Sequence, residues 1–285
     1  MTDIYEIIAR INCMLASEEG HDRCQNYFAF RSDCSDVDSS CRKSMANWCL
    51  QVADTLGFSR ETVGLGMSFF DRYLSSRRGK SQEALDSRNK FQLAAITCFY
   101  TAVKTYEPVD LGVDLLVKMC RGFYSEADII AMECDFLFAL DWRVSGPTPM
   151  DFVRHLIELL PSYESNSSLL ENTGKYMDQT ITDVSFSFFK PSVIGASCLI
   201  SSLTETHNLS SHDLDSVWVI LSEIIDIADV KRLQNMFNVN ASICLTKSSS
   251  KSRDVSTEIR RSSSTTFSST TSSPVCVTQA QGRCS

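Results

Sequence analysis

Glu133 is a carboxylate inside a run of apolar residues that has the period of a helix. The apolar residues around it recur at the 3.6-residue spacing of one helix face: Ile129, Met132, Phe136, Leu137 and Leu140. A carboxylate on such a face costs on the order of several kcal/mol when nothing pairs with it. We therefore expect Glu133 to meet a cation, backbone N–H groups or a second protein.

Signals for catalysis are weak elsewhere in the chain. Gly64-Leu-Gly66 resembles the start of a dinucleotide fingerprint, but the third glycine is missing and no strand is expected before it. There is no Walker A sequence, no His-Glu-x-x-His and no Gly-x-Ser-x-Gly. The four histidines stand apart, without a nucleophile at a recognisable spacing. An interaction module is favoured over an enzyme, with no catalytic residue and no cofactor.

The twelve cysteines are scattered, with no Cys-x-x-Cys and no histidine at zinc-binding spacing. Cys49, Cys98 and Cys198 fall inside apolar helical runs, where a free thiol packs as a small hydrophobic group. We expect reduced thiols and no metal.

Composition and charge narrow the class further. The chain has 285 residues, is 43% hydrophobic and carries a net charge of −8, enough chain for two ordinary domains with an acidic surface. An acidic balance argues against nucleic acid and anionic membranes as partners. No run of 18 apolar residues occurs, and the first residues lack the basic start of a signal peptide. We expect a protein of the nucleus and cytoplasm.

The elements that must position Glu133 are helices. The periodic segments predict a short helix within residues 1–39, then helices near 45–56, 60–75, 91–103, 111–119 and 126–142. Phe91 to Val103 contains no charged residue, which is typical of a helix in the middle of a bundle. The charged stretch 76–89 contains Gly79 and predicts an exposed loop.

A second helical series follows the breaker Gly146-Pro-Thr-Pro149, near 150–160, 166–184, 191–205, 211–227 and 229–238. The class is thus all-α, with two consecutive sets of about five helices. Residues 246–285 are rich in Ser and Thr with few large apolar residues, so we expect a disordered C-terminal tail.

Several separate elements occur together in a characteristic order. They are Arg42 and Trp48, Asp71-Arg-Tyr-Leu-Ser75, Lys90-Phe-Gln-Leu93, Lys104 before Tyr106-Glu107, Tyr124-Ser125, Met132-Glu133, Leu140-Asp-Trp142 and Pro147-Thr-Pro-Met-Asp-Phe152. Over about residues 40–155 they resemble the cyclin box. Phe189-Lys-Pro-Ser192 and the helix after it are similar to the second fold of two-box cyclins. The divisions implied are an N-terminal segment (1–39), a cyclin box (40–146), a second cyclin fold (147–245) and a tail (246–285).

The resemblance implies a regulatory subunit that binds and activates a cyclin-dependent protein serine/threonine kinase in cell-cycle control. By family analogy, Lys104 donates to backbone carbonyls of the kinase's regulatory helix and Glu133 accepts from its N–H groups. Leu137, Phe138 and Phe99 would add apolar contacts, although Phe99 fits the core better. The two charges could instead pair only with each other.

Arg42 and Asp71 resemble the buried ion pair of the cyclin box, which is structural. Met45, Trp48 and Gln92 are the positions that look competent in the family's substrate-docking patch, where Cys41 and Ser44 replace larger groups. Docking of kinase substrates or inhibitors should therefore be weak. The short N-terminal region, with no destruction box, is more similar to D-type or G1 cyclins than to mitotic ones, although no Leu-x-Cys-x-Glu occurs.

The tail offers candidate phosphorylation sites. Ser273 precedes a proline, and Ser262 and Ser263 follow two arginines, which suits proline-directed and basophilic kinases respectively. A solvated linker without modification is an equal alternative.

Other function classes make different predictions. A cyclin-fold transcription-associated factor would have a basic folded part, whereas residues 1–245 hold a net charge of about −12. A helical scaffold that does not activate a kinase would lack the Lys104 and Glu133 pair, and both are present. A helical enzyme would need a cavity with clustered polar side chains.

Overall fold

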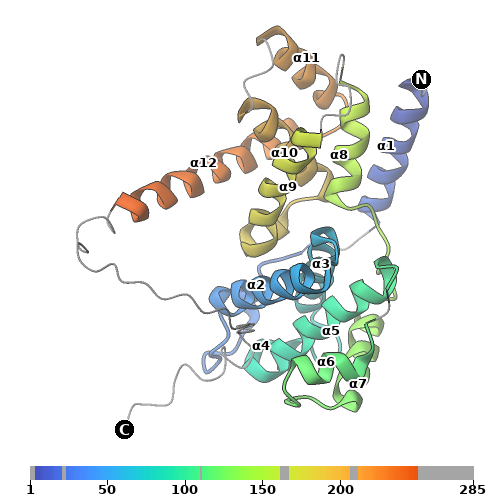
Figure 1. Ribbon diagram of the computed structural model, residues 1–285, viewed down its shortest axis with the longest axis vertical. Coiled ribbons are helices and arrows are strands. Elements are labelled where there is room, and N and C mark those ends of the chain that lie inside the picture. The colour runs from blue at the N-terminus through green and yellow to red at the C-terminus, as the bar shows by residue number, and fades with distance from the viewer. Residues whose placement is uncertain (1–3, 21–23, 110, 161–166, 206–210, 250–285) are drawn as a thin grey trace, which may run out of the picture.

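The computed structural model describes residues 4–20, 24–109, 111–160, 167–205 and 211–249. Across these residues the elements are helices, without a strand, and they form two bundles stacked on one another (Figure 1). The prediction of an all-α chain is confirmed. No helix in this part of the chain combines the length and hydropathy needed to cross a bilayer.

The first bundle is built around its most apolar helix. Its members are α2 (Ser39–Leu56), α3 (Arg60–Ser76), α4 (Ser81–Asp86), α5 (Arg88–Tyr106), α6 (Val113–Met119) and α7 (Glu126–Ala139). Helix α5 contacts α2, α3, α4 and α7 and is buried along nearly its whole length between Phe91 and Val103. The uncharged run in the sequence is therefore the centre of the bundle, as predicted.

Side-chain caps fix where these helices begin. Ser59 accepts from the N–H of Glu61 at the start of α3, and Ser125 forms a capping box with Asp128 at the start of α7. Helix α2 ends at Gly57, whose φ of 75° is in the left-handed region that glycine adopts readily. The Glu133 helix thus begins at the residue that its sequence predicted.

The second bundle has its own hydrophobic core. It contains α8 (Pro149–Glu158), α9 (Ser167–Thr182), the short 3₁₀ helix η2 (Val184–Phe188), α10 (Pro191–Glu205), α11 (Ser211–Ser222) and α12 (Ile227–Ser249). Helix α10 is central here and contacts α8, α9 and α12, and its small residues allow that close packing.

The N-terminal helix belongs to the second bundle in space. Helix α1 (Ile4–Glu19) lies beside α8, with Ile7 and Ile11 buried in the second core (Figure 1). The chain then returns to the first bundle through the 3₁₀ helix η1 (Tyr27–Phe30), where Tyr27 is fully buried. The sequence predicted the helix but not which bundle it packs on.

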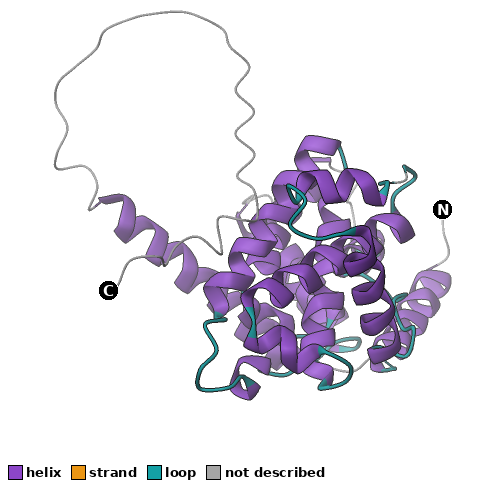
Figure 2. Cartoon of the chain, turned by 90° about the horizontal axis from the view of Figure 1, so that it is seen from below, coloured by secondary structure: helices purple, strands orange, loops and turns teal. Residues whose placement is uncertain are grey.

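Two segment predictions were wrong in extent. The stretch 76–89 is not a continuous exposed loop, because α4 forms inside it and buries Ala84 and Leu85 against the first core. Helix α12 does not end near 238 but runs to Ser249 and extends away from the body of the molecule (Figure 2). The rest of the tail that was predicted to be disordered, with Ser262, Ser263 and Ser273, lies outside the described residues.

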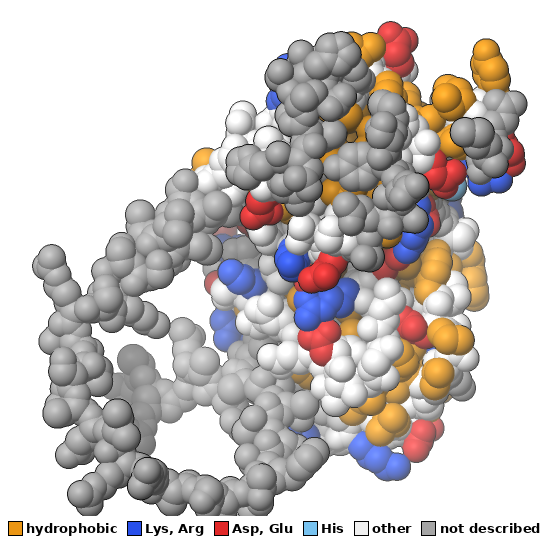
Figure 3. Space-filling model, turned by 45° about the horizontal axis from the view of Figure 1, so that its top comes forward, with side chains coloured by type: hydrophobic (Ala, Val, Ile, Leu, Met, Phe, Trp, Pro, Cys, Tyr) orange, Lys and Arg blue, Asp and Glu red, His pale blue; other side chains and the backbone are white. Residues whose placement is uncertain are grey.

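The surface has mixed character. On the face shown in Figure 3, basic and acidic side chains lie next to one another, and hydrophobic side chains reach the surface between them. Exposed ion pairs also occur among the described residues, such as Arg78 with Asp141, whose Nη1 and Oδ2 lie 2.7 Å apart. The identity of the exposed hydrophobic side chains therefore matters for function.

Candidate functional site

Lys104 and Glu133 meet at the point where α5 and α7 pack together. The Lys104 ammonium lies 2.6 Å from Oε1 and 2.7 Å from Oε2 of the Glu133 carboxylate. The hydroxyl of Thr101, one turn earlier on α5, also donates to Oε1. The charge that looked misplaced in the sequence is thus paired within the chain.

The two charges differ in exposure. The Glu133 side chain is 13% exposed and the Lys104 side chain is 34% exposed, so the cation is nearer to the surface. The Tyr100 ring lies beneath the ammonium, with its centroid 4.6 Å from Nζ. The Glu133 carboxylate and the Tyr100 ring both hold the Lys104 ammonium by electrostatic attraction.

An exposed apolar strip lies next to this pair along α7. Ile130 is 52% exposed, Phe138 is 65% exposed, and Cys134 between them is exposed as well. Their i, i+4, i+8 spacing places them on one helix face, and Ile130 lies one turn before Glu133, which is on the neighbouring face. Trp142 continues the strip with a ring 5.8 Å from that of Phe138. We call Ile130, Cys134, Phe138 and Trp142 the α7 strip.

The α7 strip is unusual in a chain that buries most of its large apolar residues. Large apolar side chains exposed together mark interaction surfaces more often than isolated ones do. A polar pair beside an exposed aromatic strip also has the composition of an interface centre. The arrangement fits binding of another protein better than chemistry on a small substrate.

The other predicted contacts divide between surface and core. Phe138 is available to a partner, whereas Leu137 is only 8% exposed. Phe99 is 1% exposed and packs edge-on against Trp48, with ring centroids 6.4 Å apart. Phe99 is therefore a core residue and not a surface contact, and of its two predicted roles the core role is the one that the structure has.

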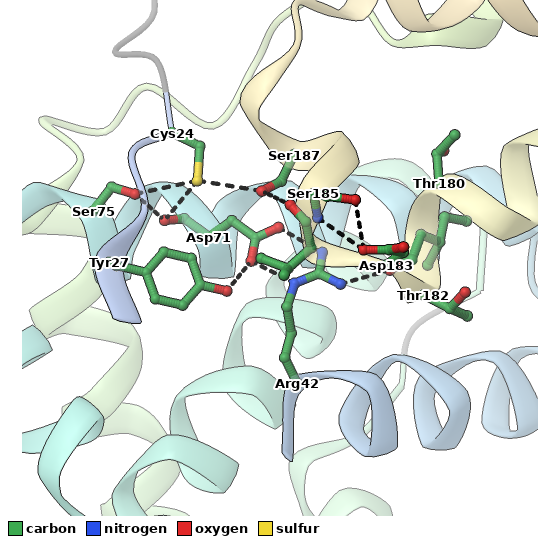
Figure 4. A network of polar contacts seen from close by, with 12 residues as sticks. Cys24, Tyr27, Arg42, Asp71, Ser75, Thr180, Thr182, Asp183, Ser185 and Ser187 are labelled. Atoms are coloured by element: carbon green, nitrogen blue, oxygen red, sulfur yellow. Dashed lines mark hydrogen bonds and ion pairs between the residues drawn. The ribbon is translucent and has the colours of Figure 1, made fainter. Parts of the chain in front are cut away.

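Arg42 and Asp71 form a buried bidentate pair that joins α2 to α3. Arg42 Nε lies 2.8 Å from Oδ1 and Nη2 lies 2.6 Å from Oδ2 of Asp71, and both side chains are 2% exposed (Figure 4). Burial by itself would lower the pKa of Arg42, but the Asp71 carboxylate outweighs it and raises that pKa. The guanidinium therefore stays charged in the core.

The same pair is connected to the second bundle and to the N-terminal segment. The remaining Arg42 nitrogen, Nη1, donates to the carbonyl of Ile181 at the end of α9, at 2.9 Å. Tyr27 donates to Asp71 Oδ1 at 2.8 Å, and burial raises the pKa of its hydroxyl, so it remains a donor. The sequence did not indicate Tyr27 or Ile181, because both contacts join segments far apart in the chain.

The candidate docking patch is not an open surface. Met45 is fully buried, Trp48 is 6% exposed and Gln92 is 2% exposed. The three side chains are therefore covered by the chain itself. The i, i+3 stripe of α2 that contains Met45 and Trp48 is the stripe that packs toward α5, and burying it stabilises the first bundle.

Metal binding has no support in the part of the chain that the structure describes, where no group of three or more His, Cys, Asp or Glu side chains could hold an ion.

Thr101 was missed by sequence reasoning as a partner of Glu133. Its position one turn before Lys104, on the same face of α5, was the available signal.

Comparisons with known proteins agree with the geometry. The model of the family described as "Cyclin, N-terminal domain" matches residues 10–145, and that of "Cyclin, C-terminal domain" matches residues 147–274. A viral cyclin from herpesvirus saimiri has a similar structure, with a TM-score of 0.64 at 17% identity, covering 79% of this chain and 95% of that one.

Relatives by sequence include D-type cyclins. G1/S-specific cyclin-D1 of Danio rerio is 28% identical over 187 residues, which are 65% of this chain and 61% of the relative. The human protein of the same name is 26% identical over 194 residues, 68% of this chain and 63% of that one. Cyclin-D3-3 of Arabidopsis thaliana is 30% identical over 164 residues, 56% of this chain and 44% of that one. This chain thus spans about three fifths of the length of the cyclin-D1 proteins.

These matches confirm the resemblance to the cyclin box, the two cyclin folds and the closer similarity to D-type than to mitotic cyclins. With a family match on each of its two bundles, the chain belongs to the cyclin family.

Proposed function

We propose that this chain binds a cyclin-dependent protein serine/threonine kinase and activates it as the regulatory subunit in cell-cycle control. Cyclins are regulatory subunits of kinases and not enzymes themselves. The relatives named G1/S-specific cyclin-D1 support a role at the G1/S transition of the cell cycle. The role would be carried out in the nucleus and cytoplasm.

One observation carries the proposal: a Lys–Glu pair lies beside the exposed α7 strip. Burying the strip against a partner would gain roughly 25 cal/mol for each Å² of apolar surface removed from water. The 65% exposed ring of Phe138 is the strongest single anchor in the strip. The Lys104 ammonium, on the neighbouring helix α5 and paired with Glu133, supplies direction, since it can donate to carbonyl oxygens at a helix end.

The activation step would be positional. A kinase is active when its regulatory helix is held inward, so that the Lys–Glu ion pair of its own active site forms. A rigid face made of α5 and α7 that binds this helix would shift the kinase toward the active state. The cyclin would thereby act on an equilibrium between two states and contribute no catalytic group.

Substrates and inhibitors of the kinase are further candidate partners. Met45, Trp48 and Gln92 are buried, so docking through them would require the side chains around them to move. We expect this contribution to be small.

Co-purification with a panel of cyclin-dependent kinase catalytic subunits tests the proposal. The wild-type chain should retain at least one kinase and raise its activity. Phe138→Asp should weaken that binding by at least about tenfold, because hot-spot residues contribute this much or more. Val219→Asp is the matched control, since Val219 is 63% exposed on α11 of the second bundle. Equal binding by Phe138→Asp and wild type, or no retained kinase, would contradict the proposal.

A further inference from the structure

A cavity of about 450 Å³ lies between the two cyclin folds. Its walls come from α3 of the first fold and from α8, α9, η2 and the start of α10 of the second. A pocket of this size at the junction of two folded units is typical of binding sites for small organic molecules. No residue of α5 or α7 lines it, so it is separate from the α7 strip.

A glycine borders the cavity on each side. Gly64 lies within α3 and Gly174 within α9, and neither has a positive φ, so the backbone does not require glycine at either position. Glycine inside a helix is less stable than alanine. A Cβ added at Gly174 would meet no atom from another part of the described structure within 4 Å, so close packing does not require this glycine either. Gly174 therefore leaves open a space that a larger side chain would fill.

The walls of the cavity are mostly apolar and adaptable. Met67, Met150 and Met177 line it together with the ring of Phe188, which is 37% exposed. Methionine side chains are flexible, adjust to the shape of a ligand and make favourable contacts with aromatic rings. An apolar molecule that contains rings fits such a lining.

The charged side chains of the lining are already paired. Acidic and basic residues are equal in number there, and each has a partner within the chain. At exposed positions, Arg60 pairs with Asp178, and the Lys175 ammonium lies 3.4 Å from the Glu171 carboxylate. An ion brought into the cavity would find these charges engaged, and an unpaired ion in an apolar site is costly. The lining therefore favours an uncharged ligand.

We propose that the cavity between the two folds binds an uncharged, ring-containing apolar molecule. The ligand enters beside Ser68 and Lys175, which are exposed at the edge of the cavity. It touches both folds at once, so its binding stabilises the docked arrangement in which the cavity exists. This site goes beyond the proposed kinase binding, because it uses neither Lys104 nor the α7 strip.

Nile red, an uncharged dye with fused rings, is the probe for this site in a fluorescence titration of the full chain. The wild type should bind it saturably, and binding should raise the unfolding temperature. Gly174→Leu fills the open space and should weaken the affinity for the dye by at least about tenfold, because a single methylene in an apolar pocket can change affinity by that factor. Gln179→Leu is the matched control, since Gln179 is exposed on α9 outside the lining, and it should bind as wild type does.

Two further variants keep the titration decisive. If Gly174→Leu does not unfold cooperatively, Ser68→Arg takes its place, because it brings a long charged side chain to the edge of the cavity from α3. Phe138→Asp should keep the wild-type affinity, which shows that the dye does not bind at the α7 strip. Wild-type affinity in the folded cavity variant, a loss in Phe138→Asp or Gln179→Leu, or no saturable binding would overturn the proposal. Kinase binding by the wild type is a separate result.

A charged dye tests the class of ligand. Anilinonaphthalene sulfonate is an anionic ring compound, and it should bind more weakly than Nile red because each lining cation already has a partner. Tighter binding of the sulfonate, lost in Gly174→Leu, would overturn the assignment of an uncharged ligand.

Discussion

At the scale of single residues, the chain contains two ion pairs with different roles. Arg42 and Asp71 are both 2% exposed, and every guanidinium nitrogen of Arg42 has an acceptor. Lys104 and Glu133 lie partly at the surface, next to apolar side chains. A buried pair with an acceptor at each guanidinium nitrogen fixes geometry, whereas a pair at the surface can also meet a partner.

Asp71→Asn should destabilise the protein strongly, because it leaves the Arg42 cation in the core without its counter-charge. We expect the free energy of unfolding in urea to fall by about 3–5 kcal/mol. Asp141→Asn is the control: it removes the partner of Arg78 from an exposed, solvent-screened pair and should change the free energy of unfolding little. An unfolding midpoint for Asp71→Asn equal to that of wild type would show that the pair does not stabilise the fold.

At the scale of helices, periodicity and breaker residues were sufficient for most of the fold. The uncharged run of α5, the apolar period around Glu133 and the breaker before Pro149 each predicted an element that the structure contains. The pattern failed at α4, because a short helix that buries only a few residues in a charged segment has too weak a period. Periodicity predicted the helix that carries Met45 and Trp48, but an apolar stripe looks the same whether it faces a core or a partner.

Packing of α3 on α5 depends on one glycine. A Cβ added to Gly66 would lie 2.8 Å from the Cα of Phe99, too close for the two backbones to stay in place. Gly66→Ala should therefore lower the unfolding free energy by about 1–3 kcal/mol, as overpacking does. Two residues earlier, a Cβ at Gly64 would meet Ile181 at an ordinary 3.6 Å. Gly64→Ala should leave the unfolding free energy unchanged or raise it by up to about 1 kcal/mol. If denaturant unfolding showed Gly64→Ala to be less stable than Gly66→Ala, this account of the α3–α5 interface would be refuted.

Helix α1 is attached to α10 by a buried carboxylate. Glu18 accepts from the backbone N–H of Ser192 at 3.0 Å and from its hydroxyl at 2.6 Å. Burial raises the pKa of Glu18 above its ordinary value of 4.5, despite these bonds and the nearby Lys190. The folded state thus favours the protonated form, and this contribution to stability is lost as pH rises from 4.5 through the raised pKa.

Glu18→Gln removes the ionisable group and keeps an acceptor for Ser192. The stability of the variant relative to wild type should therefore increase as pH rises above 4.5, measured by urea unfolding at several pH values. Glu6→Gln is a control on the same helix, where Glu6 is 54% exposed beside Arg10, and its difference from wild type should stay small. A relative stability of Glu18→Gln that falls with rising pH would contradict the assignment.

At the scale of the whole molecule, polar contacts hold the two cyclin folds together. Arg42 reaches the end of α9, Arg154 of α8 pairs with Glu61 of α3 at 2.6 Å, and Arg60 bridges Asp54 and Asp178. None of these contacts could be read from the sequence, since each depends on how the two folds are docked. The α7 strip lies on the first fold, so the second fold supports the binding face without forming it.

The central claim is that the face made by α5 and α7 activates a kinase, and a kinase assay with Lys104→Ala/Glu133→Ala tests it most directly. Removing both charges avoids leaving either one unpaired. Lys175→Ala/Glu171→Ala removes an exposed Lys–Glu pair from α9 as the matched control. We predict that activation falls by at least about tenfold in the first variant, as expected for the loss of an interface hot spot, and is unchanged in the control. Full activation by Lys104→Ala/Glu133→Ala would contradict the account.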